Sequence, residues 1–191
     1  DHEGTGLAEP FTYANVDGWN FIGNPFTSAI DWTTVDAGAA NLYDAVYFYD
    51  GSNYSSWVNG TDSWDGAGTN GGSQYIPAMQ GFFVKSNNTS GGTLSIPSSA
   101  RIHNNQKFWK ANEKETPMNF IRIEVESNSV FDETIIRFLE NATASMDNKM
   151  DAFKRFSMDE NVPQVYTVSA DDTEYSINTL AVPVQSLTIP V

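Results

Sequence analysis

Carboxylates that could hold a cation are the first candidates for chemistry in this chain. Asp147 and Asp151 are four residues apart, with Asn148 between them. Calcium takes carboxylate, amide and backbone oxygens as ligands. On a helix these two carboxylates would lie one turn apart and repel each other unless a cation or Lys154 relieved them. The pattern predicts either a calcium site at Asp147 and Asp151 or an exposed polar loop without a ligand.

Three aromatic residues within a polar segment form the second candidate site. Tyr54, Trp57 and Trp64 lie in residues 52–73, which are rich in Gly, Ser, Asn and Asp and poor in aliphatic residues. This composition predicts a long surface loop or wide hairpin rather than a core element. Exposed aromatic rings beside hydrogen-bonding side chains are typical of carbohydrate-binding β-sandwiches. The alternative is that the rings fold back over a hydrophobic edge.

Recognisable catalytic motifs do not occur in the sequence. There is no cysteine, and the two histidines, His2 and His103, have no partners at zinc-ligand spacing. Neither a Gly-x-Ser-x-Gly elbow nor a phosphate-binding glycine loop before a helix is present. With 24 acidic residues, carboxylate pairs for glycoside cleavage could be drawn in many ways, so they carry no specificity. We expect no enzymatic activity.

Composition limits the partners and predicts a folded chain. Of the 191 residues, 40% are hydrophobic and 13% aromatic, which is enough for a packed core. Ten basic residues against 24 acidic ones give a formal net charge of -14. Such a surface repels phosphate backbones and anionic lipid, so we expect no binding to nucleic acid. No apolar run reaches the roughly 18 residues of a membrane span, so we expect no membrane insertion.

The candidate carboxylates and aromatic residues must be positioned by strands. The sequence contains short β-branched and aromatic runs, which are separated by Gly, Asn, Ser, Asp and Pro. They predict an all-β fold made of antiparallel β-sandwich lobes, jelly-roll-like or Ig-like, with at most one short helix. The run "AVYFYD" at 45–50 is apolar enough for a strand buried on both faces. The expected strands are 19–22, 42–49, 74–76, 81–85, 93–96, 118–126, 133–139, 164–168, 174–177 and 186–189.

Side-chain periodicity gives more detailed expectations. Trp19 and Phe21 share one face of a strand, so both are predicted to enter the core. In "NFIRIEVE" the alternation predicts Ile123 and Val125 inward and Arg122 outward. The helix is expected over 147–155, because four apolar residues recur there at roughly helical spacing and Ser145 could cap its start; the four are Met146, Met150, Phe153 and Phe156.

A polar, positively charged stretch at 101–114 suggests a junction between two β-rich halves. We place a β-sandwich lobe at 1–104 and a second β-rich lobe, complete or truncated, at 105–191. The sequence leaves open whether these halves are independent domains or two lobes of one unit.

The order of several motifs resembles a known module. These motifs are "GWNFIGNPFTSAIDW" (18–32), "AVYFYDGSNYSSW" (45–57), "YIPAMQGFFVKSN" (75–87) and "LSIPSSARIHNNQKFWK" (94–110), followed by "FDETIIRFLENATASMDNKMDAFKRF", "VPQVYTVS", "YSINTL" and "LTIPV". The series resembles the β-sandwich module that precedes the C-terminal sorting domain in large type IX-secreted surface proteins of Bacteroidetes. The resemblance covers residues 18–191.

That resemblance implies export by the type IX secretion machinery and an extracellular or cell-surface location. It implies partners among the other domains of a parent surface protein and no catalytic residue set. We expect a non-catalytic structural or adhesive module, and a fragment or processing product of a longer chain. One alternative is a carbohydrate-binding module that uses loop 54–64 on an extracellular polysaccharide. Another is a calcium-stabilised adhesion repeat.

Overall fold

The computed structural model describes residues 7–11, 17–61, 66–103, 120–183 and 188–191, which form short strands joined by turns. In these ranges the only helical elements are two single 3-10 turns, η1 (Trp32–Thr34) and η2 (Ser98–Ala100), and no helix could span a membrane. The predicted all-β sandwich fold is confirmed. The strands are β1 (Leu7–Phe11), β2 (Trp19–Gly23), β3 (Ala29–Asp31), β4 (Ala45–Tyr49), β5 (Tyr54–Val58), β6 (Ala67–Thr69), β7 (Tyr75–Ile76), β8 (Gly81–Lys85), β9 (Gly92–Ile96), β10 (Arg101–Ile102), β11 (Phe120–Ser127), β12 (Val130–Phe138), β13 (Ala152–Phe153), β14 (Thr167–Val168) and β15 (Glu174–Leu180).

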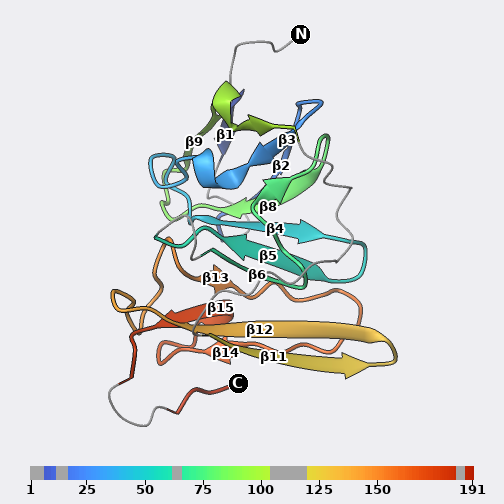
Figure 1. The fold of residues 1–191 in the computed structure, drawn as a ribbon, viewed down its shortest axis with the longest axis vertical. Helices are drawn as coiled ribbons and strands as arrows, with labels where there is room; N and C mark the ends of the chain where they lie inside the picture. Colours follow the sequence, from blue (N-terminus) through green and yellow to red (C-terminus); the bar gives the residue numbers. More distant parts are fainter. Residues whose placement is uncertain (1–6, 12–16, 62–65, 104–119, 184–187) are drawn as a thin grey trace.

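The strands build layers that are stacked along the long axis of the molecule (Figure 1). The central sheet has the order β2-β8-β4-β5-β6, and the C-terminal sheet has the order β11-β12-β15-β13, with β14 also paired to β15. Two smaller sheets, β1-β9 and β10-β3-β7, lie toward the N-terminal end. The central sheet therefore has one layer on each side of it.

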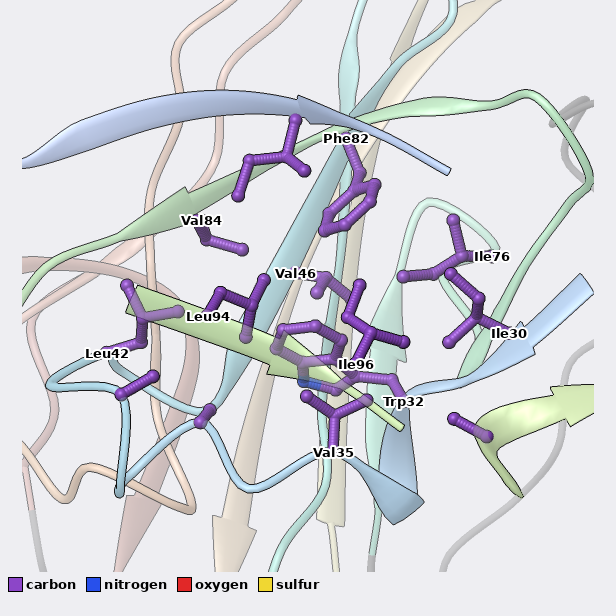
Figure 2. Packing of buried hydrophobic residues seen from close by; sticks show 14 of the residues in the cluster. Ile30, Trp32, Val35, Leu42, Val46, Ile76, Phe82, Val84, Leu94 and Ile96 are labelled. Atoms are coloured by element: carbon purple, nitrogen blue, oxygen red, sulfur yellow. The ribbon is translucent and has the colours of Figure 1, made fainter. Parts of the chain in front are cut away.

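Strand β4 contributes to a hydrophobic core on each face of the central sheet. Val46 and Phe48 belong to the first core, on the side of the small sheets, where Trp32 and Phe82 also pack (Figure 2). Ala45 and its alternate neighbours face the second core, between the central and C-terminal sheets. The prediction that this strand is buried on both faces is confirmed. The second core consists of Ala45, Tyr47, Val58, Ala67, Ile135, Ala152 and Ile177.

The second core takes side chains from both predicted halves of the chain, 1–104 and 105–191. Residues 104–114, which are most of the proposed junction at 101–114, lie outside the described residues. One strand pair departs from the antiparallel expectation, because β12 and β15 run parallel. The long connection between these two strands contains β13 and β14, which both pair with β15.

The predicted helix over 147–155 is wrong. Residues 148–150 form a turn, and β13 follows in an extended conformation. Ala152 pairs with Ile177 of β15, and its side chain is fully buried in the second core. Sheet pairing overrides the helical spacing of the apolar residues here, and Phe156 is left exposed.

The segment at 52–73 forms the wide hairpin that was one of its two predicted forms, since β5 and β6 pair antiparallel. The expectation that it is not a core element is wrong in its described part. The segment contains two strands of the central sheet, and every residue of β5 is buried. The polar side chain of Ser56 is accommodated because it bonds to another side chain. The Ser56 hydroxyl lies 2.6 Å from the Thr69 hydroxyl, so both buried groups are satisfied.

Three facing predictions, those for Phe21, Val125 and Arg122, are reversed in the structure. Phe21 is 67% exposed while Ile22 enters the first core, because the register with β8 places Phe21 opposite Phe83 and over Gly81. Trp19 is half-buried and packs against the second core. On β11, Val125 is exposed.

Candidate functional site

The predicted sugar-binding aromatics do not form an exposed platform. Tyr54 and Trp57 lie on β5, which is an interior strand of the central sheet, and each is only 8% exposed. Their positions alternate, so Trp57 faces the first core and Tyr54 faces the opposite side. The Trp57 ring nitrogen donates to the Asn59 side-chain oxygen at 3.1 Å. Trp64 lies outside the described residues.

The predicted calcium ligands are close together, but backbone donors already bind them. The two carboxylate oxygens of Asp151 accept the Asp147 and Thr179 N–H groups, both at 2.7 Å. Asp147 accepts the Thr143 N–H at 2.6 Å. Burial raises the pKa of Asp151 to about 7, against the lowering effect of these hydrogen bonds. Within the described ranges, no group of three or more Asp, Glu, His or Cys side chains could hold a metal ion. The two carboxylates organise the turn at 147–151.

Arg155 lies among aromatic rings at the edge of the second core. Its guanidinium carbon is 4.3 Å from the ring centroid of Trp19, 4.7 Å from that of Tyr54 and 4.9 Å from that of Phe83. One of its nitrogens also donates to the Tyr54 hydroxyl at 3.1 Å. These contacts attach the segment after β13 to the central sheet through cation–π attraction.

Lys85 occupies a similar position beside Arg155. Its ammonium nitrogen is 4.0 Å from the ring centroid of Phe153 and 5.2 Å from that of Trp19. Burial lowers its pKa, against the raising effect of Asp17. Two of the chain's ten basic residues therefore serve to join layers.

The Asp132 carboxylate in β12 is bonded to four donors. One oxygen accepts the side-chain amides of Asn53 at 3.2 Å and Asn70 at 2.9 Å. The other accepts the Val165 N–H at 2.8 Å and the Lys154 ammonium. Asp132 is fully buried, and its four donors come from four separate segments. We call Asp132 with these donors the interlayer network.

A second carboxylate extends this network on the other face of β12. Glu133 accepts the Asn70 N–H at 2.5 Å and forms an ion pair with Arg122 of β11. This ion pair explains why Arg122 points inward, contrary to the sequence prediction. Asn70 adopts a left-handed conformation, with φ of 50°, which Asn tolerates better than most residues. Its backbone and side chain thereby reach both carboxylates.

The interlayer network was missed because its members lie far apart in the sequence. Asn53 and Asn70 belong to the stretch predicted as surface loop, while Lys154 belongs to the predicted helix. One local signal was present: Asp132 and Glu133 are adjacent in a strand whose other residues, apart from Thr134 and Arg137, are apolar. Adjacent residues of a strand face opposite sides, so two acids in a strand buried on both faces imply a polar partner on each side.

Asp44 is a further buried carboxylate, and it lies between the central sheet and the turn at 148–150. It accepts the Asn59 amide at 2.9 Å, and its own N–H donates to the Asn148 carbonyl at 2.9 Å. Burial raises its pKa to about 7, against the lowering effects of Lys149 and Asn59. Like the interlayer network, this group joins two layers.

Residues 2–189 match the model of a family described as "Domain of unknown function (DUF8693)". No curated protein and no solved structure matches the chain. The match spans nearly the whole sequence, so the interlayer network and both cores lie within the family's domain.

Proposed function

The chain belongs to the DUF8693 family, and we propose that it is a non-catalytic structural or adhesive module of a larger secreted or cell-surface bacterial protein. The ordered sequence motifs support the secreted or cell-surface location, because they resemble modules of type IX-secreted Bacteroidetes proteins. The arrangement of buried charges supports the structural role.

The observation that carries this proposal is the Asp132 carboxylate. A catalytic carboxylate must reach a substrate, whereas this one is fully buried and bonded to four donors. Asp44 and Asp151 are also buried, and each is bonded to groups from other segments. Asp132 and Asp44 thus hold layers together, and Asp151 attaches the turn at 147–151 to β15.

Sugar binding has weaker support in the described part of loop 54–64. Stacking on a sugar requires an exposed ring face, and Tyr54 and Trp57 offer almost none. The structural role is therefore our conclusion, and glycan binding serves as a competing outcome in its test.

The location can be tested in the producing bacterium with an antibody raised against the purified chain. We expect the antigen in the medium or on the surface of intact cells, where added protease removes it. Antigen that is found only inside lysed cells and is protected from protease in intact ones would contradict the proposed location.

The structural role can be tested on the purified chain with an array of bacterial and plant polysaccharides. We expect no retention above that of a matched acidic β-sandwich protein. Retention that is lost in Trp64→Ala, while Trp64→Phe keeps it, would instead establish the sugar-binding function.

A further inference from the structure

Lys154 and Asp132 form a direct side-chain contact that is closed to solvent. The ammonium nitrogen of Lys154 contacts an oxygen of Asp132, and the two side chains are 2% and 0% exposed. Asp132 belongs to β12, and Lys154 directly follows β13. These elements are separated in the C-terminal sheet by β15. A link between the two side chains would therefore fasten β12 to the segment after β13.

We propose that Lys154 and Asp132 condense into an intramolecular amide, which covalently joins β12 to the segment after β13. The ammonium first gives one proton to the contacting oxygen, Oδ2. The resulting amine attacks Cγ of Asp132, so a C–N bond forms and the bond from Cγ to Oδ2 breaks. Oδ2 leaves as water, taking that proton and a second one from the attacking nitrogen. An ammonium and a carboxylate thus become one amide and one water, with no oxidant or other reactant.

Burial favours the neutral pair that the first step requires. Removing an ion pair from water is costly, and transfer of one proton inside the pair abolishes both charges. Burial also lowers the pKa of Lys154, against the raising effect of Asp132. The same exclusion of water slows hydrolysis of the amide once it has formed.

The donors around Asp132 are arranged for attack on its Cγ. Asn53 and Asn70 both donate to Oδ1, the oxygen that stays as the amide carbonyl. Negative charge develops on this oxygen during the attack, and fixed donors stabilise such charge. The Val165 N–H donates to Oδ2, the oxygen that leaves. Oδ1 keeps both of its partners in the product.

The second buried ion pair of the C-terminal sheet provides an internal comparison. Arg122 and Glu133 also touch, but the guanidinium is always protonated and cannot act as the attacking amine. Arg122 is moreover 16% exposed. Of the ion pairs that the structure describes, the Lys154–Asp132 pair therefore has both required properties: its cation is a lysine, and both of its side chains are closed to solvent.

The test is the intact mass of the whole purified chain under denaturing conditions. We expect a mass lower by one water than the mass calculated from the sequence. A succinimide at any of the three Asp-Gly pairs, Asp17–Gly18, Asp50–Gly51 and Asp65–Gly66, would lose the same water, so variants are needed. Lys154→Met must show its full calculated mass, whereas Lys149→Met, which changes an exposed lysine, must keep the loss.

Peptide mapping of the wild-type chain decides the question even where a variant folds poorly. We expect a fragment in which peptides containing residues 132 and 154 are joined, with fragment ions that locate the bond on these side chains. A wild-type mass equal to the calculated one, or a water loss that persists in Lys154→Met, would overturn the proposal. The amide and the module's cell-surface role can each fail without the other.

Discussion

The hydroxyl oxygens of Ser56 and Ser176 lie 3.0 Å apart, although 120 positions separate the two residues in the sequence. Ser56 belongs to β5 of the central sheet and Ser176 to β15 of the C-terminal sheet. Ser176 continues the contact to the Phe153 carbonyl at 3.1 Å. A chain of hydrogen bonds therefore crosses the boundary between the sheets, beside the apolar side chains of the second core.

Replacing Ser56 with Ala should weaken the attachment between the two sheets. The change leaves the buried hydroxyls of Thr69 and Ser176 short of one partner each, which costs about 1–2 kcal/mol in the free energy of unfolding. Urea unfolding measures this loss. Ser95→Ala is the control, because Ser95 is exposed on β9 and should change stability little. Equal effects of the two changes would contradict this account of the boundary.

Removal of Asp132 alone should be far more damaging than removal of both Asp132 and Lys154. Asp132→Ala leaves the Lys154 ammonium buried with neither a counter-charge nor an amide partner, which costs about 3–5 kcal/mol. In Asp132→Ala/Lys154→Met neither charge remains, so part of that stability should return. Thermal or urea unfolding of both variants tests the difference. A double variant that is no more stable than the single one would show that the charge of Lys154 is not the cause.

Asn24 should be the most sensitive residue of the Gly-Asn-Pro turn. Its side-chain amide donates to the carbonyls of Ser28 and Pro77 at 3.0 and 2.9 Å, and its oxygen accepts the Phe26 N–H at 2.9 Å. Asn24→Ala leaves these buried groups unsatisfied and should cost about 2–3 kcal/mol. Calorimetric unfolding provides the measurement.

Asn161→Ala is the matched control for this turn, because Asn161 is exposed and its side-chain amide donates to nearby Asp159. It should leave the melting temperature nearly unchanged. If Asn24→Ala behaved like this control, the turn would not depend on the buried amide.

Apolar strands were the part of the fold most accessible to sequence reasoning. The predicted bounds of β8 agree with the structure, and β4 is buried on both faces as its composition indicates. In β8, Phe82 and Val84 are fully buried while Phe83 is not, which is the expected alternation. Burial of such strands requires no partner of special chemistry, so local composition suffices to predict them.

Polar strands could not be predicted, because their burial depends on distant partners. Ser56 is acceptable inside the protein only because Thr69 and Ser176 satisfy its hydroxyl. In the same way, Asp132 needs donors such as Asn70, which no local pattern links to it. The candidate site was missed for this reason: it is assembled by the topology and not by a motif.

A side chain at position 81 should occupy space that the ring of Phe21 fills. A Cβ there would lie 2.3 Å from this ring, so Gly81→Ala must displace it. Because Phe21 is mostly exposed, the ring can move away and the cost should be modest, about 1 kcal/mol. In a Phe21→Ala background the same change should cost almost nothing. A double-mutant cycle by urea unfolding measures this coupling, and additive effects would disprove it.

Asp44 should make the stability of the protein decrease as the pH rises. Its pKa is raised from 3.8 to about 7 by burial, so between these values the folded state binds the proton more tightly than the unfolded state. Stability from this group is therefore fully present below about pH 4 and is lost as the pH rises through about 7. Asp44→Asn removes this dependence while its side-chain oxygen can still accept the Asn59 amide.

The measurement is the difference in unfolding free energy between Asp44→Asn and the wild type, taken at pH 4 and at pH 8. It should shift in favour of the variant by about 4 kcal/mol between these two values, since the pKa is raised by about three units and a full unit corresponds to about 1.4 kcal/mol. Asp159→Asn changes a fully exposed carboxylate whose pKa is lowered, first by the Asn161 N–H, so its contribution to stability is lost only as the pH falls below about 4, and its difference should stay nearly constant between pH 4 and pH 8. A difference for Asp44→Asn that stays constant across this range would show that Asp44 is ionised in the folded protein throughout.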